Sequence, residues 1–389
     1  MNLTIKLPTM TGTLETWRVQ GTPLDVLAPE RPFNRIAYSA AHVVADPLRA
    51  GELNGPPALD WERTISYRRY LLQQGLGIAE AMDTAQRGMG VPWSTALELI
   101  QRCVEGTRDI EGALIASGCG TDHLPLASVT SVDDVIRAYA EQLEAVQRTG
   151  SRVILMASRA LAKVARGPDD YSRVYREALR LCDQPAILHW LGDMFDPELA
   201  GYWGATDFAS AADVCLSIID ENTAHVEGIK ISLLDDQKEV AFRRRLPRNM
   251  QMYTGDDFNY PSLIEGDGTH YSHALLGIFD AIAPAASQAL SALASGDTAR
   301  FHTLLAPTVP LSRHIFRAPT QYYKTGVVFL AHLNGFQDHF FMPGGHHGMR
   351  PPAYLADVFR LADQAGLLRQ PEDAVARMRR ALTPLGCGD

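Results

Sequence analysis

The chain has 389 residues, of which 46% are hydrophobic and 21% are charged, and its formal net charge is −9 at pH 7. This charge and the lack of a basic stripe argue against a general nucleic-acid-binding protein. The sequence contains no uninterrupted run of 18 apolar residues, so we expect no membrane span. Five scattered cysteines and an N-terminus without an apolar signal core favour a cytoplasmic protein with reduced thiols.

Residues 1–33 form an N-terminal extension. Two short alternating stretches, NLTIKLP and GTLETWRV, flank the turn sequence TMTG and predict a β-hairpin. A proline-rich connection follows this hairpin and leads into the rest of the chain.

Residues 34–295 repeat one unit, in which a short apolar strand is followed by a helical pattern such as residues 131–150, capped by Ser131. The strands are apolar on both faces, as buried parallel strands are. Eight such units predict an α/β fold of the (β/α)₈ barrel class. A doubly wound open sheet is the alternative, but no GxGxxG follows the first strand. The predicted strands are residues 35–40, 76–82, 112–117, 152–157, 185–190, 227–231, 249–255 and 274–280.

Residues 296–389 are predicted to be a C-terminal helical region appended to the barrel. The Gly/Pro-punctuated loop at 336–352 contains two adjacent histidines, His346 and His347. Because no second histidine pair accompanies them, we expect a lid or a subunit contact there and not a metal site. We expect the N-terminal extension to cover the bottom of the barrel, where His270 and His273 also belong.

Active sites of such barrels lie at the C-terminal ends of the strands. From the pair Asp256–Asp257, alternation sends one side chain inward and the other outward, and we assign Asp256 to the site. Cys119 is expected to be a small apolar filler and not a nucleophile. The candidate site residues are His42, Glu80, Asp83, Thr84, Arg159, His189, Lys230, Asp256 and Asp280.

Lys230 interrupts the apolar, β-branched run VEGIKIS. Burial lowers the pKa of an amine, and a neutral amine can attack a carbonyl to form a Schiff base. The resulting iminium withdraws electrons, which permits cleavage or formation of a carbon–carbon bond or loss of water. A lysine that reaches solvent or pairs with a carboxylate is the alternative.

Several motifs resemble those of the dihydrodipicolinate synthase / N-acetylneuraminate lyase superfamily of class I aldolases. EGIKISLLDD is similar to that family's GIKEATGD, PAILHWLGDMFDPEL to its PxxLYNxPxRTGxxL, and MYTGDDFNYPSLI to its xxSGDDxxxLxxL. The similarity runs from about residue 35 to the C-terminal helices and indicates a divergent branch, DUF993. It implies a TIM barrel, a Schiff base at Lys230, and a homodimer or homotetramer.

The departures from the family's motifs concern the residues that select the substrate. His189 stands at the position of the fifth-strand tyrosine, and Met194 at that of an arginine. The second-strand loop that holds pyruvate aligns with MDTAQRG, where Asp83 and Thr84 keep polar positions. We therefore expect a neutral, hydroxyl-rich carbonyl substrate.

The leading hypothesis is a lyase, aldolase or dehydratase that acts on a small carbonyl compound, a keto acid or a keto-sugar, without a metal or other cofactor. Lys230, His189 and Asp83 would be catalytic. A divalent-metal-dependent sugar isomerase or epimerase is the second hypothesis, and a catalytically inactive binding protein is the third. The residues left to bind substrate are His42, Glu80, Thr84, Arg159, Asp256 and Asp280. The metal ligands of the second hypothesis would be Glu80, Asp83, His189 and Asp256.

Overall fold

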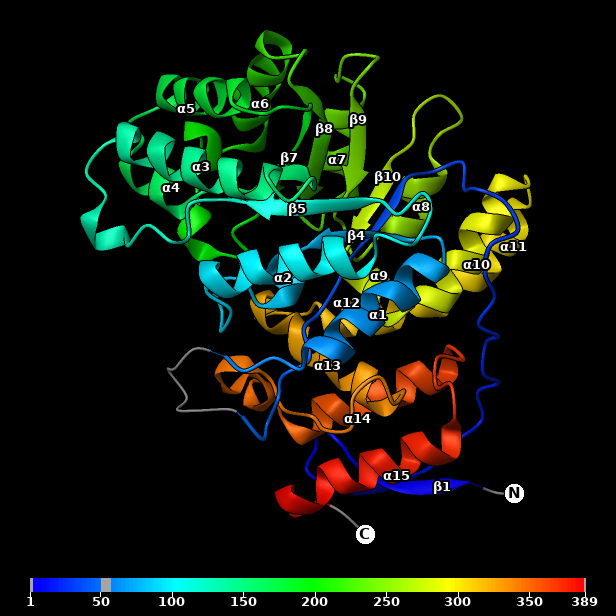
Figure 1. Ribbon diagram of the computed structural model, residues 1–389. Helices are drawn as coiled ribbons and strands as arrows, with labels where there is room; N and C mark the ends of the chain where they lie inside the picture. Colours follow the sequence, from blue (N-terminus) through cyan, green and yellow to red (C-terminus); the bar gives the residue numbers. More distant parts are fainter. Residues whose placement is uncertain (1–2, 50–56, 388–389) are drawn as a thin grey trace.

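The structure, a computed structural model, describes residues 3–49 and 57–387 (Figure 1). Eight parallel strands close into a barrel in the order β10-β3-β4-β5-β6-β7-β8-β9, and β1 and β2 form a separate antiparallel hairpin. The closed barrel and the N-terminal hairpin confirm the fold predicted from the sequence. The strands are β1 (Thr4–Pro8), β2 (Leu14–Arg18), β3 (Ala37–Ala40), β4 (Gly77–Glu80), β5 (Ile115–Cys119), β6 (Arg152–Leu155), β7 (Ala186–Leu191), β8 (Val226–Ser232), β9 (Gln251–Thr254) and β10 (His273–Leu276).

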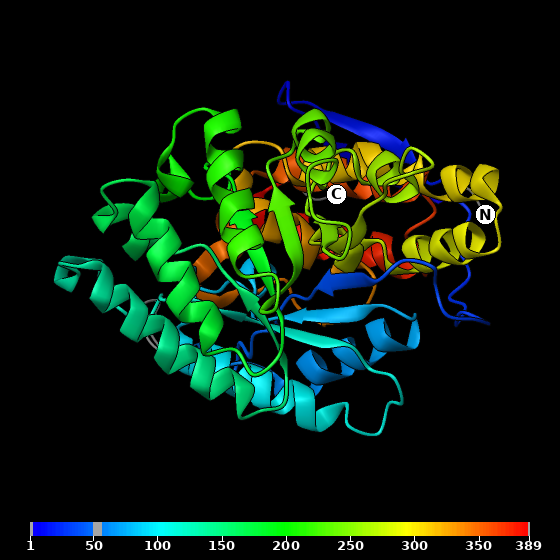
Figure 2. The ribbon, with the colours of Figure 1, turned by 90° about the horizontal axis from the view of Figure 1, so that it is seen from above.

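Helices connect the strands and continue beyond the last of them, as the periodicity predicts. Ser131 caps α3 through its side chain, in a reciprocal capping box with Asp134. Figure 2 shows the helices around the strands, with the C-terminal helices behind the barrel in that view. The α-helices are α1 (Trp61–Gln73), α2 (Trp93–Gly106), α3 (Val132–Gln147), α4 (Arg159–Val164), α5 (Pro168–Arg180), α6 (Phe208–Glu221), α7 (Asp236–Arg243), α8 (Tyr260–Glu265), α9 (Ile278–Ala281), α10 (Ala283–Ala294), α11 (Thr298–Leu305), α12 (Thr308–Ile315), α13 (Tyr323–Leu333), α14 (Pro352–Gln364) and α15 (Pro371–Leu382). The short 3₁₀ helices are η1 (Asp83–Ala85), η2 (Leu126–Ser128), η3 (Pro197–Leu199), η4 (Tyr202–Gly204), η5 (Thr320–Tyr322), η6 (Pro343–Gly348) and η7 (Thr383–Leu385).

The barrel interior is filled by one set of alternating side chains, among them Tyr38, Ile154 and Leu275, while the other set packs against the surrounding helices. The register pairs Lys230 of β8 with His189 of β7 on one side and with Tyr253 of β9 on the other. Side chains of the inward set from these three strands therefore lie close together.

The C-terminal helices lie at the end of the barrel where the strands finish. Helix α13 contacts both η1, which follows β4, and α9, which follows β10. The end of the barrel where the strands finish is therefore covered by a helix of the C-terminal region. No helix within residues 3–49 and 57–387 is long and apolar enough to span a bilayer.

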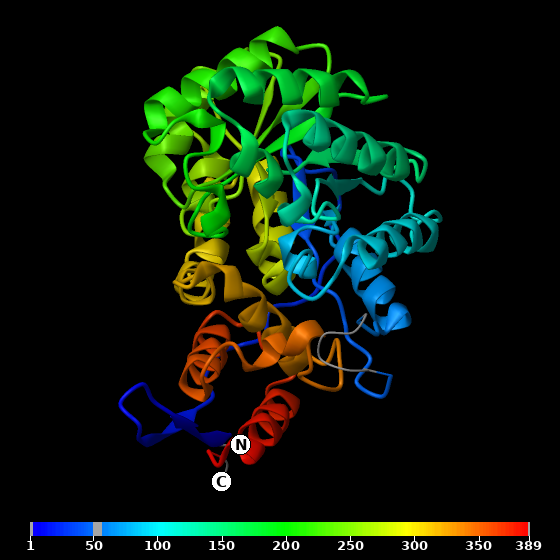
Figure 3. The same cartoon turned by 90° about the vertical axis from the view of Figure 1, so that its left-hand side faces the viewer.

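The hairpin packs against the C-terminal helices and not against the bottom of the barrel, which corrects the expectation for the extension (Figure 3). Arg360 of α14 donates to the carbonyls of Leu7 and Pro8, and Arg379 of α15 donates to that of Thr4. The end of the extension does reach the bottom, where Pro29 and Phe33 lie against the turn at Gly75 that precedes β4.

Candidate active site

Lys230 lies inside the closed barrel, near the end of β8. It is only 7% exposed, and among the described residues its amine has no hydrogen bond and no ion pair. Gly255 makes room for it, because a Cβ there would lie 2.7 Å from Lys230 Cε and 2.2 Å from Ser232 Oγ. Burial lowers the pKa of Lys230, while the nearby carboxylates of Asp257 and Asp83 oppose this shift. The amine is thus sheltered and more readily neutral than an exposed lysine.

His189 of β7 stands beside Lys230. Its Nε2 lies 3.3 Å from Ser232 Oγ, and its Nδ1 is buried without a partner in the described part of the chain. Burial, and then the charge of Lys230, lowers the pKa of His189 well below its usual value. The imidazole is therefore neutral at pH 7, with one ring nitrogen left to exchange a proton with a bound molecule.

Asp257, and not Asp256, is the inward carboxyl group after β9. Asp256 accepts hydrogen bonds from the backbone N–H groups of Phe258 and Asn259, so it holds the turn into α8. Asp257 is buried, accepts a 2.8 Å bond from the Ile278 N–H, and acts electrostatically on Lys230. This corrects the sequence-based assignment.

A tyrosine from the C-terminal region enters the site. The hydroxyl of Tyr323, at the start of α13, lies 2.8 Å from Oγ1 of Thr84 on η1, and its ring stacks on Phe316 at 4.3 Å between centroids. Burial and then the charge of Asp83 raise the pKa of Tyr323, and Asp257 adds to this. The phenol is therefore a protonated donor next to both carboxyl groups that act on Lys230. Sequence reasoning missed it, although QYYK is a polar start to an otherwise apolar helix.

Glu80 is placed outside the barrel, facing α1. Both of its carboxylate oxygens accept hydrogen bonds from Arg68, at 2.7 and 2.8 Å, and both side chains are fully buried. The structure therefore does not bring Glu80 to the mouth with the other candidates. A charged side chain at the end of an apolar strand can point into the barrel or out toward the helices. Glu80 points outward because its partner, Arg68, lies on α1.

His42 and Asp280 form a buried pair of their own. His42 Nδ1 lies 2.8 Å from Asp280 Oδ2, and the hydroxyl of Tyr67 donates to the Asp280 carbonyl at 2.7 Å. His42 Nε2 is buried without a partner in the part of the chain that the structure describes. The charge of Asp280 also acts on Tyr323, so this pair adjoins the site.

A cavity of about 270 Å³ opens at the ends of the strands from β4 to β7. Asp83 lines it, and so do Arg159 of α4 and Lys324 of α13. Lys230 does not line it but lies close enough to Asp83 for that carboxylate to act on its pKa. Asp83 thus lies between the open cavity and the sheltered amine.

A comparison with models of protein families assigns this chain to one family. The model of the family DUF993, described as a protein of unknown function, matches residues 5–387. The chain belongs to the DUF993 family. A search of curated protein sequences gave no match.

Solved structures of the dihydrodipicolinate synthase family share the fold of this DUF993 member. YagE, a prophage protein of that family from E. coli K12 in complex with pyruvate, has a TM-score of 0.66 at 12% identity, over 86% of this chain and 99% of its own. The dihydrodipicolinate synthase from Acinetobacter baumannii complexed with pyruvate gives 0.61 at 16% identity, with the same two coverages. The enzyme from Aquifex aeolicus gives 0.63 at 11%, again over 86% and 99%. The TM-scores show that the fold is shared, and this agrees with the resemblance read from the motifs.

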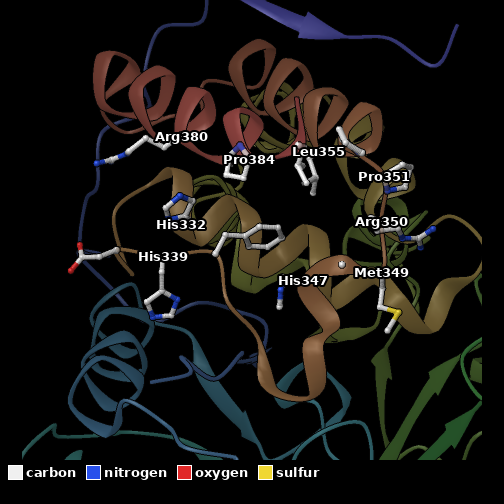
Figure 4. A pocket seen from close by; sticks show the side chains of 15 residues that line it. His332, His339, His347, Met349, Arg350, Pro351, Leu355, Arg380 and Pro384 are labelled. Carbon is white, nitrogen blue, oxygen red and sulfur yellow. The ribbon is translucent and has the colours of Figure 1, made fainter. Parts of the chain in front are cut away.

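A larger cavity of this DUF993 member, about 760 Å³, lies away from the barrel mouth (Figure 4). It is enclosed by α13–α15 and the loop at 336–352, and His332, His339 and His347 line it with mostly apolar neighbours. Burial lowers the pKa of His332 to about 4. Among the described residues that line this cavity there is no lysine, and the carboxylate of Asp338 is paired with Arg63. The smaller cavity is therefore the better candidate for chemistry.

The four residues named as metal ligands do not converge in this DUF993 member. Glu80 is bound to Arg68, and Asp256 holds its own turn. Within residues 3–49 and 57–387, no three or more His, Cys, Asp or Glu side chains are grouped to hold a metal ion. The geometry therefore brings together Lys230, His189, Asp83 and Thr84, and adds Asp257 and Tyr323.

Proposed function

We propose that this protein is a Schiff-base-forming lyase or aldolase that acts on a small carbonyl compound, a keto acid or keto-sugar, through Lys230. The observation that carries the proposal is the Lys230 amine, which is enclosed in the barrel without a hydrogen-bond or ion-pair partner in the described residues. An unpaired buried amine costs stability and is retained where its chemistry is used.

The reaction begins with attack of the neutral amine on the carbonyl carbon of the substrate. Two proton transfers release the carbonyl oxygen as water and leave a protonated Schiff base. The bond between the α-carbon and the β-carbon then breaks. The β-hydroxyl gives its proton to a base, the β-carbon leaves as an aldehyde or ketone, and the electron pair of the broken bond passes to the iminium nitrogen to give an enamine. Protonation of the enamine carbon and attack by water release the product and restore Lys230.

The proton transfers fall to groups that lie around the Lys230 amine. His189 is neutral and has Nδ1 free to accept a proton, while Tyr323 is a protonated phenol held by Thr84. Asp83 lies at the wall of the cavity, where substrate enters. We assign His189 and Tyr323 as acid and base groups, with Asp83 assisting.

Two of the structures with this fold were solved with pyruvate, which supports a carbonyl substrate for a related barrel. The motif departures at His189 and Met194 support a substrate other than pyruvate. The expected homodimer or homotetramer stays a prediction, which sedimentation equilibrium would test.

Borohydride trapping tests the proposal directly. The protein is incubated with keto acids and keto-sugars, reduced with sodium borohydride, digested and measured by mass spectrometry. The expected result is a substrate-sized mass increase on the peptide that contains Lys230. No adduct across the panel, together with activity that depends on Mn²⁺ and is lost on chelation, would favour the isomerase hypothesis instead.

A further inference from the structure

The cavity at the ends of β4 to β7 is lined by a second buried amine-bearing residue. Lys324 of α13 is 3% exposed and lines this cavity. Its Nζ donates to the Gln321 carbonyl at 3.0 Å and lies 3.2 Å from Met89 Sδ, but it forms no ion pair among residues 3–49 and 57–387. A buried ammonium that keeps donor capacity next to a cavity is suited to bind an anion.

Arg159 lies on the same cavity and adds further donors. Its Nε donates to Asp196 Oδ2 at 2.6 Å, and its two terminal nitrogens have no hydrogen bond within the described chain. The side chain is 46% exposed, so these nitrogens can turn toward a ligand. Its charge also lowers the pKa of Lys324, which shows that the two cations are close enough to repel each other.

The carboxylates around the cavity neutralise these cations only in part, since Asp196 pairs with Arg159 through Nε alone and also acts on Lys324. Asp122 is taken up by Arg87, and Asp196 is held by Arg159. Asp83 acts on Lys324 and on Lys230 alike, while Asp196 acts on Lys324 and Asp257 on Lys230. Burial lowers the pKa of Lys324 to about 8, which leaves the ammonium form predominant at pH 7.

We propose that Lys324 and Arg159 bind an anionic group of the substrate, a carboxylate or a phosphate, at the opposite end from the carbonyl that meets Lys230. The inference rests on the proposed function and names its substrate class as an anionic keto compound, in place of the neutral compound expected from the motifs. A cavity of about 270 Å³ admits a compound the size of a small sugar acid or sugar phosphate.

The first experiment compares matched carbonyl probes in the borohydride assay. Dihydroxyacetone phosphate is paired with dihydroxyacetone, and levulinate with 5-hydroxypentan-2-one. The anionic member of at least one pair is expected to be trapped about tenfold faster or more, as one charge-assisted hydrogen bond implies. Faster trapping of dihydroxyacetone phosphate would indicate a phosphate as the anionic group, and faster trapping of levulinate would indicate a carboxylate. Equal trapping within both pairs would overturn the inference.

Variants test whether the two cations carry this preference. Lys324→Met and Arg159→Gln are each expected to lower the anionic-to-neutral trapping ratio about tenfold. Lys238→Met, which removes an exposed lysine of α7, is the matched control for net charge and keeps the ratio. Arg159 is half-exposed, so its variant folds even if the buried lysine proves necessary for folding. A ratio that stays unchanged in Arg159→Gln and Lys324→Met contradicts the assignment.

A second readout separates this inference from the proposed function. In a Lys230→Met background, which cannot form a Schiff base, glycerol 3-phosphate or glycerate is expected to raise Tm while glycerol is not. The shift should disappear with Lys324→Met. If no probe is trapped but this shift occurs, the lyase proposal fails and the anion site stands. If probes are trapped without a preference and no anion shifts Tm, the anion site fails alone.

Discussion

The two ends of the barrel interior differ in how their buried charges and imidazoles are paired, although the hydroxyl of Tyr38, at the end with paired charges, is buried without a hydrogen bond among the described residues. At the end where the strands begin, Arg152 forms an ion pair with Glu227, and the hydroxyl of Tyr253 donates to the same carboxylate. His273 also has both ring nitrogens bonded, at 2.9 Å to the Ile36 N–H and at 2.7 Å to the side chain of Gln251. These groups are matched within the protein.

At the other end, polar groups of the same strands are left unmatched. Lys230 lies on β8 with Glu227, yet its amine has no hydrogen-bond or ion-pair partner in the described residues, and His189 keeps Nδ1 free. Buried groups that only stabilise a fold are normally hydrogen-bonded. The contrast indicates that one end of the barrel is built for stability and the other for binding and chemistry.

Removing the unmatched amine gives the largest expected effect on activity. Lys230→Met should abolish the borohydride adduct and lower kcat/KM on the order of 10³-fold or more. Because a buried unpaired charge is replaced by an apolar chain of similar length, the free energy of unfolding should rise by about 1 kcal/mol. Trapping assays and urea unfolding measure both. An adduct on another peptide of the variant would show that the nucleophile lies elsewhere.

Removing the hydroxyl of Tyr323 should have the next largest effect. Tyr323→Phe is expected to lower kcat about 10²-fold by deleting a proton donor, with little change in KM. Tyr354→Phe is the matched control, because the buried Tyr354 hydroxyl donates to the Ile315 carbonyl at 3.0 Å. Apart from burial, only Arg350 and Arg317 among the described residues act on its pKa. The control should lose only about 1 kcal/mol of stability. Equal kcat losses in the two variants would reduce Tyr323 to a structural role.

Breaking the matched end should change stability without changing chemistry. Glu227→Gln leaves Arg152 without its carboxylate and weakens the bond to Tyr253. The free energy of unfolding is expected to fall by about 1–3 kcal/mol, as urea titration would show. The rate of adduct formation at Lys230 should stay as in the unmodified protein. A large loss of trapping would mean that the two ends are coupled.

The smallest predicted effect is a shift in pH dependence. Schiff-base formation needs the neutral amine, so kcat/KM should rise as pH rises through the pKa of Lys230, which burial lowers. The Asp257 carboxylate favours the ammonium and so raises this pKa. Asp257→Asn should therefore move the acidic limb of the kcat/KM profile to lower pH. Asp256→Asn is the control and should leave the limb in place, and a limb that moves to higher pH would contradict the placement of Asp257.

Local alternation explains which site residues could be predicted and which could not. Gly228, Lys230 and Ser232 alternate with apolar residues, so one face of β8 is evident from the sequence. For the pair Asp256–Asp257 after β9, the inward residue is harder to predict, because the residues of that strand do not show which of its faces is inward. Tyr253, Gly255 and Asp257 share the inward parity in the structure, which is why Asp257, and not Asp256, lies toward Lys230.

Contacts between distant segments decided the rest. Glu80 follows an apolar strand like a mouth residue, but Arg68 on the preceding helix binds it outside the barrel. Tyr323 and Lys324 stand 47 and 48 residues after the end of β10 at Leu276, in a region that the sequence marked only as helical. No strand-based argument could assign them to the site, because their position depends on how α13 packs over η1 and α9.

The sequence by itself determined the eight-stranded barrel, the hairpin and the appended helices, because buried strands and amphipathic helices each impose a local period on apolar residues. It also marked Lys230, since an amine within a buried strand is chemically conspicuous. Only the tertiary structure decided which carboxylates face that amine and which helix covers it. These neighbours of Lys230 are brought together by packing between distant segments of the chain, and such packing produces no periodic pattern in the sequence.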